Sequence, residues 1–382
     1  MSVKLAERMK TSREYIHARL ARLASEVEAK TGRKVLRFGA GSPDVPPSEK
    51  YVAKLTEFLH DKDAHLYPGY TGIPEFTTAV QAYYKRRFGV DLDKDEIMPL
   101  LGGKDGIAHL PMAMIDAGDE FLVPDPGYPA FVGPAIMMGG KPVTYDLKPE
   151  TGFKVDIAQL KSKVTPRTKY AWINFPSNPT GQVATLEDVQ SFVNFSKETN
   201  VPVIYDNCYA EIAFDGFVPP SILQIQGAKD SCVELGSFSK AFSFAGNRMG
   251  WLVGNRDIIA AVAKIKSQMD SGMWLPLQRL GAYALTNTDT EWHAKMIESY
   301  KSRRDLIAEK FRTLGCAIEI PKAALYLWAK IPDSAKNSEE FTMHLLNEKH
   351  ILVTPGSAFG KNGERYIRVS YCVNIENINM YL

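Results

Sequence analysis

The feature that most constrains the fold of this chain is a series of short apolar runs, each followed by a turn that carries polar residues or glycine. Between about residues 91 and 255 these strand-like runs alternate with helical stretches, and clear examples cover 170–173, 201–206 and 232–235. Such alternation is typical of a mostly parallel sheet covered by helices. Ligands of open α/β sheets bind at the carboxyl ends of the strands, so we expect the polar residues that follow these runs to form a binding site.

The length of 382 residues predicts two domains, because single cores usually stop growing at ~250 to 300 residues. From Trp292 onward, apolar residues recur with the spacing of a long amphipathic helix that leads out of the first domain. We therefore expect an α/β architecture with a large domain over 51–290. A smaller, discontinuous α/β domain then combines 1–50 with 291–382.

Charge and hydropathy exclude several classes of protein. The 46 basic and 44 acidic residues nearly balance, and no basic block with interleaved aromatic residues stands out, so we expect no nucleic-acid partner. The apolar segments are short and broken by glycine, proline or charge, so none reaches the ~20 residues of a membrane-spanning helix. The cysteines and histidines show no ligand spacing, and we expect no metal. A charged start over 1–22, without an apolar signal core, favours a cytoplasmic enzyme.

The segment 236–251 contains the most informative side chain, Lys240, which has serines on both sides, apolar neighbours and an arginine eight residues later. An amine among apolar groups loses hydration, which frees the lone pair needed for a Schiff base with an aldehyde. Ser237 and Arg248 offer a hydroxyl and a planar charged group that suit a phosphate. These features together indicate a phosphorylated aldehyde, and the expected cofactor is pyridoxal 5'-phosphate.

Two other interpretations of this segment exist. Most lysines simply solvate a surface, and short motifs often match by chance. The serine and lysine of 237–240 also fit the pattern of penicillin-binding proteins, with a Lys-Thr-Gly at 30–32. In those proteins the Lys-Thr-Gly follows the nucleophile, and this sequence has no Ser-Asp-Asn, so we interpret the second match as coincidence.

The apolar run 201–206 ends in a carboxylate and is followed by a phenol. The carboxylate is Asp206, which can hold a pyridine nitrogen protonated and so makes the ring an electron sink. Tyr209, three residues later, offers a phenol to the ring's 3-oxygen. The alternative for Asp206 is a helix N-cap after the strand.

Three further turns carry candidate ligands. Asn178 lies between two prolines that would hold its amide rigidly, as a donor to the 3-oxygen requires. Gly103 and Lys104 open a plausible helix, and the unpaired amides of a helix start attract phosphate. Tyr128, also flanked by proline, can stack on a pyridine face. Ordinary turn chemistry and a core tyrosine remain the alternatives for these residues.

With these motifs in one consistent order, the chain resembles the class I/II aminotransferases, which are fold-type I pyridoxal phosphate enzymes. The resemblance runs nearly end to end. The matching residues are Gly41, Tyr67, Gly103, Lys104, Tyr128, Asn178, Asp206, Tyr209, Ser237, Lys240, Arg248 and Arg368.

The resemblance implies a role for each matching residue. Lys240 forms the Schiff base, Asp206 pairs with the pyridine nitrogen, and Tyr209 bonds the 3-oxygen together with Asn178. Tyr128 stacks on the ring. The groups implied to hold the phosphate are the amides of Gly103 and Lys104, the side chains of Ser237 and Arg248, and Tyr67 from a neighbouring subunit. A homodimer with shared active sites is therefore expected.

The resemblance also implies how the substrate binds. Arg368 clamps the α-carboxylate, and Gly41 and Asn178 lie beside it. Two parallel hydrogen bonds from a guanidinium fix the tilt of a carboxylate, which favours breaking the Cα–H bond over losing carbon dioxide. A freed Lys240 can then move that proton.

The expected activity is exchange of an amino group between an amino acid and a 2-oxo acid by a ping-pong mechanism. Lys104 in 102–106 resembles the branch of LL-diaminopimelate aminotransferases and related enzymes for aspartate, alanine or glutamate. No cation for a distal carboxylate can be placed from the sequence. The alternatives are a fold-type I carbon-sulfur lyase or decarboxylase and, third, a non-catalytic regulatory module that binds the cofactor.

Overall fold

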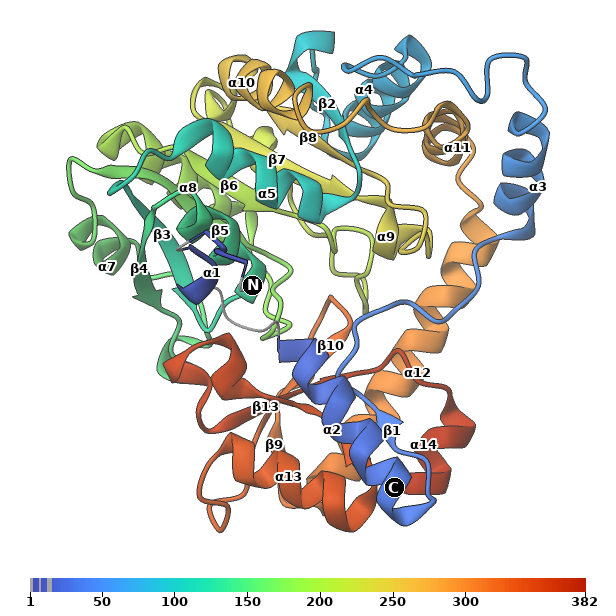
Figure 1. The fold of residues 1–382 in the computed structure, drawn as a ribbon, viewed down its shortest axis with the longest axis vertical. Coiled ribbons are helices and arrows are strands. Elements are labelled where there is room, and N and C mark those ends of the chain that lie inside the picture. The colour runs from blue at the N-terminus through green and yellow to red at the C-terminus, as the bar shows by residue number, and fades with distance from the viewer. Residues whose placement is uncertain (1–2, 7, 12–15) are drawn as a thin grey trace.

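The computed structural model describes residues 3–6, 8–11 and 16–382 (Figure 1). Its described strands form a seven-stranded, a four-stranded and a two-stranded sheet. We call the part built on the seven-stranded sheet the large lobe, and the part built on the other two sheets the small lobe. None of the described helices combines the length and the apolar character that crossing a membrane requires.

The seven-stranded sheet has the strand order β2-β8-β7-β6-β5-β3-β4. The four pairings from β7 to β4 are parallel, whereas β8 runs antiparallel to both β7 and β2. The prediction of a mostly parallel sheet is thus confirmed. The strands are β2 (Ile97–Leu100), β3 (Glu120–Asp125), β4 (Lys141–Asp146), β5 (Thr168–Asn174), β6 (Val203–Asp206), β7 (Cys232–Ser237) and β8 (Gly250–Gly254).

Helices cover both faces of this sheet, which is why its central strands are buried throughout. Successive strand residues point to opposite faces, so Leu122 joins one apolar cluster while its neighbours Phe121 and Val123 join the other. The helices of the large lobe are α3 (Glu49–Phe58), α4 (Pro74–Phe88), α5 (Gly103–Met114), α6 (Gly133–Met137), α7 (Ile157–Ser162), α8 (Leu186–Thr199), α9 (Phe238–Ala241), α10 (Arg256–Lys266) and α11 (Leu275–Thr286).

The small lobe joins both ends of the described chain. β1 pairs in parallel with β11, and α2 packs beside α13 (Figure 1). Its four-stranded sheet is antiparallel, in the order β12-β13-β10-β9. The strands are β1 (Leu36–Arg37), β9 (Ala317–Ile318), β10 (Tyr326–Lys330), β11 (Ile351–Leu352), β12 (Thr354–Pro355) and β13 (Tyr366–Ser370). The helices are α2 (Ile16–Thr31), α13 (Ser338–Lys349) and α14 (Ile375–Tyr381), and α1 (Arg8–Thr11) precedes them.

The long amphipathic helix expected after Trp292 is α12 (Thr290–Thr313). Its buried residues include Met296, Tyr300 and Phe311, which pack in the core of the small lobe. The helix runs from the large lobe into the small one (Figure 1). It therefore connects the two lobes.

Candidate active site

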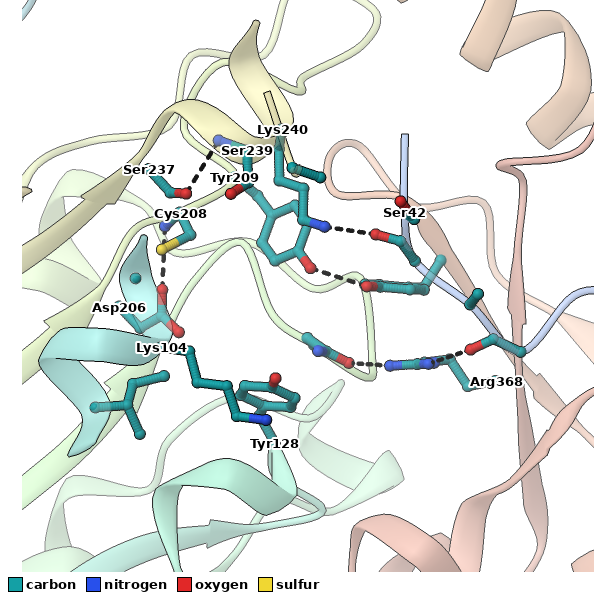
Figure 2. Close-up of a pocket in the computed structure, with 18 of the residues that line it drawn as sticks. Ser42, Lys104, Tyr128, Asp206, Cys208, Tyr209, Ser237, Ser239, Lys240 and Arg368 are labelled. Carbon is teal, nitrogen blue, oxygen red and sulfur yellow. Dashed lines mark hydrogen bonds between the residues drawn. The ribbon is translucent and has the colours of Figure 1, made fainter. Parts of the chain in front are cut away.

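A cavity of about 400 Å³ lies where the two lobes meet (Figure 2). Its walls bring together every residue expected from the sequence except Tyr67. From the large lobe these are Gly103, Lys104, Tyr128, Asn178, Asp206, Tyr209, Ser237, Lys240 and Arg248, and from the small lobe Gly41 and Arg368.

Strand ends explain why distant residues converge here. Asp206 is the last residue of β6, and Ser237 is the last residue of the neighbouring β7. Asn178 follows β5, which pairs with β6 on its other side. Because these three strands are parallel, their carboxyl ends lie at one edge of the sheet, as ligand sites in such sheets do.

Lys240 is carried by α9, the short helix that directly follows β7. Ser237 caps this helix, since its hydroxyl accepts a hydrogen bond from the backbone N–H of Ser239 over 3.1 Å. The buried ring of Phe238 packs edge-on against Trp251, with ring centroids 4.9 Å apart. This anchorage directs Lys240 into the cavity, where its Nζ donates to the carbonyl oxygen of Gly41 over 2.5 Å (Figure 2).

Asp206 is a buried carboxylate that forms no ion pair among the described residues, with 5% of its surface exposed. One oxygen accepts the backbone N–H of Cys208 over 3.1 Å. Cys208 begins a turn rather than a helix, so the alternative of a helix N-cap is wrong. Burial raises the pKa of Asp206 above its usual range. A protonated ring nitrogen would supply the positive charge that this carboxylate needs.

The start of α5 forms a recess that only glycine permits. Gly102 has φ of +86°, and a Cβ there would lie 2.5 Å from Nη2 of Arg248. A Cβ on Gly103 would lie 2.9 Å from the sulfur of Cys208. The first backbone N–H groups of this 12-residue helix, the Ser237 hydroxyl and the Arg248 guanidinium therefore face the same space, and their donor chemistry fits a phosphate.

Arg368 is the buried cation of the cavity, with 1% of its surface exposed. Its guanidinium lies over the rings of Tyr326 and Phe359, at 4.2 and 4.8 Å from their centroids. It donates to Oδ1 of Asn178 and to the carbonyl oxygen of Gly39, each over 2.7 Å. Among the described residues no carboxylate pairs with it, and its Nε has no hydrogen-bond partner. A substrate carboxylate would satisfy both needs.

The bond to Arg368 also orients Asn178. Since Oδ1 of Asn178 accepts from Arg368, its amide nitrogen is turned the other way and can donate. The backbone N–H of Asn178 is held by Oδ1 of Asn174 over 2.8 Å. An amide fixed in this way fits the expected donor to a ring oxygen.

Lys104 and Tyr128 line the cavity on the side away from Arg368. Figure 2 shows their side chains next to each other. Tyr128 packs edge-on against Phe131, with ring centroids 5.5 Å apart. Tyr67 is different, because it does not line the cavity and is 88% exposed. Its expected role across a subunit interface stays a prediction.

Several cavity residues escaped the analysis of the sequence. Tyr326 is the most prominent, and its hydroxyl lies 2.9 Å from that of Tyr209. A Cβ on Gly41 would collide with the Tyr326 hydroxyl. A glycine in the sequence can indicate that another group packs closely against the backbone, but it does not identify that group. The others are Arg37, Gly39, Ala40, Ser42, Cys208 and Ser239, with Leu20, Ala21, Ile107, Ala245 and Leu352 as apolar lining.

A cluster formed by Asp105 and His109 of α5 and by Asp270, which follows α10, has the composition of a metal site. Lys266, with 2% of its surface exposed, donates to Asp105 over 2.8 Å and to Asp270 over 2.5 Å. Burial raises the pKa of Asp105, but hydrogen bonds from His109 and Lys266 outweigh it and lower the pKa to about 2. The ammonium group thus already supplies a cation to both carboxylates, and Asp105 also holds the backbone N–H of Leu101 over 2.8 Å.

Comparisons with known proteins agree with this geometry. The family model described as aminotransferase class I and II matches residues 33–382. LL-diaminopimelate aminotransferase of Halothermothrix orenii is 38% identical over 98% of this chain and 95% of its own length, and that of Aquifex aeolicus is 39% identical over 98% and 96%. Among solved structures, apo-BacF of Bacillus subtilis covers 100% of this chain and 97% of its own, with 33% identity and a TM-score of 0.93. A mutant aspartate aminotransferase of Thermus thermophilus has 26% identity, the same TM-score and coverage of 100% and 98%.

Proposed function

Because the chain belongs to the aminotransferase class I and II family, we propose that the cavity between its lobes binds pyridoxal 5'-phosphate on Lys240. The chain is an aminotransferase, which exchanges amino groups between amino acids and 2-oxo acids. One observation supports the binding proposal above all. A lysine amine stands in a cavity that also contains a buried carboxylate, Asp206, and a buried guanidinium, Arg368, neither of which is paired with an opposite charge among the described residues.

Different residues of the cavity would bind different parts of the cofactor. The recess at Gly103 would take the phosphate with Ser237 and Arg248, and Asp206 would hold the ring nitrogen. The residues proposed to contact the ring itself are Tyr128, Asn178 and Tyr209, with Lys104 beside Tyr128. Bound pyridoxal phosphate supplies a conjugated ring that accepts the electron pair released when the substrate loses its α-proton.

The chain's own groups hold the substrate and move the proton. Arg368 binds the α-carboxylate, and its hydrogen bond to Oδ1 of Asn178 keeps the guanidinium in place while it does so. Lys240 is the base that takes the proton from Cα and returns it elsewhere on the reacting pair. Asp206 stays ionised and keeps a positive charge favourable at the ring nitrogen.

We further propose LL-diaminopimelate as the amino donor. Full-length relatives at 38–39% identity carry that name. The cavity also offers cations besides Arg368, because Lys104 and Arg37 both line it. Arg37 reaches it from β1 and forms an ion pair of 2.9 Å with Glu28. A substrate with a distal carboxylate would complement these cations.

The test is to incubate the purified holoenzyme with LL-diaminopimelate and 2-oxoglutarate and to measure glutamate by mass spectrometry. Glutamate production that exceeds the rate with aspartate or alanine as donor supports the proposal. A faster rate with either of those amino acids contradicts the substrate assignment but leaves the aminotransferase activity intact. Release of ammonia or carbon dioxide without glutamate would instead identify a lyase or a decarboxylase, and no turnover would favour a regulatory module.

We also propose a homodimer in which Tyr67 reaches the partner's cavity. Tyr67 is 88% exposed, and Leu66 and Tyr70 of the same segment are 64% and 51% exposed, so three large apolar or aromatic side chains lie open within five residues. Light scattering at micromolar concentration that gave the mass of one chain would contradict the dimer.

The domain bounds and the cellular location are also proposals. We propose that the large domain spans 51–290 and that the small domain combines 1–50 with 291–382, in keeping with the separate apolar cores of the lobes. Proteolytic nicking concentrated away from residues 50 and 290 would count against these bounds. We propose a cytoplasmic location because all four cysteines are free in the structure, as in reducing compartments, and cell fractionation tests it.

A further inference from the structure

Tyr326 is a buried phenol that touches both functional halves of the cavity. Its hydroxyl lies 2.9 Å from the hydroxyl of Tyr209, which comes from the large lobe. The face of its ring covers the Arg368 guanidinium at 4.2 Å. Its hydroxyl also occupies the space that a side chain at position 41 would need. Tyr326 begins β10 and is 3% exposed, so these contacts are fixed by packing.

The contact between the two hydroxyls has a direction if Tyr209 serves the cofactor. A phenol has one proton to donate, and a Tyr209 that donates into the cavity has none left for Tyr326. Tyr326 must then be the donor, with the oxygen of Tyr209 as its acceptor. Hydrogen bonds in such a chain polarise one another, so the bond from Tyr326 strengthens Tyr209 as a donor.

The contact with Arg368 fixes the orientation of the clamp. The guanidinium is flat, and it lies over the rings of both Tyr326 and Phe359. Its remaining bonds, to Asn178 and Gly39, lie at the edge of this flat group. A guanidinium held in this plane presents its edge to a carboxylate at a fixed tilt.

We propose that Tyr326 is a positioning residue of the reaction, which directs the proton of Tyr209 toward the cofactor's 3-oxygen and holds the Arg368 guanidinium in the plane that binds the substrate carboxylate. This inference rests on the proposed function, because it assumes that the cavity binds pyridoxal phosphate. It assigns two separable tasks to one side chain, the first to its hydroxyl and the second to its ring.

Tyr326→Phe separates the two tasks, because it removes the hydroxyl and keeps the ring. The readout for the first task is the pH titration of the visible band of the holoenzyme. A weaker bond from Tyr209 leaves more electron density on the 3-oxygen, which favours the protonated imine. We expect the midpoint to move upward by about 0.5 to 1 pH unit, the size of one neutral hydrogen bond. The affinity for succinate, a simple dicarboxylate probe, should change less than about twofold.

Tyr326→Leu also removes the ring, so the affinity for succinate should fall by about tenfold. Tyr145→Phe is the matched control, because the Tyr145 hydroxyl is equally buried and donates to Trp172 away from the cavity. It should lower the unfolding temperature and leave both the midpoint and the succinate affinity unchanged. A Tyr326→Phe variant that behaves like this control would reduce Tyr326 to a structural role and overturn the proposal.

A double-mutant cycle shows whether Tyr326 acts through Tyr209. Tyr209→Phe alone should raise the midpoint, and adding Tyr326→Phe to it should produce no further shift. Additive shifts would overturn the proposed direction of the bond. If the wild-type holoenzyme has no visible band that borohydride removes, the proposed function itself is wrong. A normal wild-type band with an unshifted Tyr326→Phe midpoint contradicts only the role of Tyr326.

Discussion

Arg368 of the small lobe donates a hydrogen bond of 2.7 Å to the side chain of Asn178 in the large lobe. Both residues are buried and line the cavity. The carboxylate clamp is thus completed only when both lobes are in place. A change in the angle between the lobes would alter the distance from the clamp to Lys240 as well.

Lys240→Ala should retain the cofactor by its phosphate and ring contacts but lose amino transfer by at least roughly 10³-fold, since one residue is both the anchor and the base. Borohydride reduction and peptide mapping measure the anchor directly. Wild-type protein should carry the label on Lys240, and the variant should carry none. Lys104→Ala is the control, because Lys104 is a second amine in the same cavity and its removal should leave the label in place. A label on Lys104 would refute the assignment.

Asp206→Asn should make the cofactor-free protein more stable and the holoenzyme less active. Burial raises the pKa of Asp206, so ionisation of this group is easier in the unfolded chain. The loss of folding stability caused by ionising buried Asp206 is absent below ~3.9, the pKa of this group in the unfolded chain. It grows as the pH rises from there through the raised pKa of the folded protein. The variant should therefore unfold at a higher temperature at pH 7.5 but not at pH 4, and its amino transfer should fall roughly 10²–10³-fold. Asp333→Asn, at a position 93% exposed, should change neither property.

Gly102→Ala should weaken cofactor binding by about 10- to 100-fold, because the new Cβ would displace the Arg248 guanidinium from the phosphate recess. Fluorescence titration of the cofactor-free protein with pyridoxal phosphate gives the affinity. Gly118→Ala is the matched control, since Gly118 has a similar φ of +93° and open space around it. Equal losses of affinity in both variants would mean that backbone strain, and not Arg248, is responsible.

His109→Gln should lower the free energy of unfolding by about 1 to 2 kcal/mol at pH 6. The hydrogen bond to Asp105 raises the pKa of His109 in the folded protein. The stability that this bond contributes is fully present below the unfolded pKa of ~6.5 and is lost as the pH rises through the raised folded value. Urea unfolding of both proteins from pH 5.5 to 9 should show a shrinking difference. His60→Gln, at an exposed site, should show none, and a difference independent of pH would contradict the ion pair.

Tyr67→Phe should weaken retention of the cofactor by roughly tenfold in the dimer, because the phenol would lose a hydrogen bond to the phosphate of the partner's site. Dialysis followed by absorbance measures how much cofactor remains bound. Tyr70→Phe changes another exposed phenol of the same segment and should retain the wild-type affinity. Unchanged retention in Tyr67→Phe would argue against a shared active site.

The part of the site on the large lobe can be predicted from the sequence because local order suffices. Asp206 and Ser237 each follow an apolar strand, and parallel strands bring their ends together whatever the details of packing. Lys240 then follows Ser237 within the next helical turn. The mostly parallel sheet and the long helix α12 are predictable for the same reason, since both depend on periodic patterns of apolar residues.

The contacts between the lobes could not be predicted in this way. Tyr326 meets Tyr209 across 117 residues of chain, and no local pattern distinguishes it from the apolar residues that follow it in β10. The cluster around Lys266 is another example, because its members lie on α5 and in and after α10, which pack together only in the folded protein. Burial of a lysine is visible only once both helices are placed.

The pairing of β1 with β11 has a consequence for how a ribosome-bound chain acquires its site. All strands of the seven-stranded sheet precede residue 255, whereas the β1 residues Leu36 and Arg37 pair with Ile351 and Leu352. The segment that contains β1 and Gly41 therefore lacks its pairing partner β11 until more than three hundred further residues have been synthesised. Nascent chains arrested near residue 300 should resist protease over the sheet yet remain cleavable before residue 48, so that cofactor capture becomes one of the last events of translation.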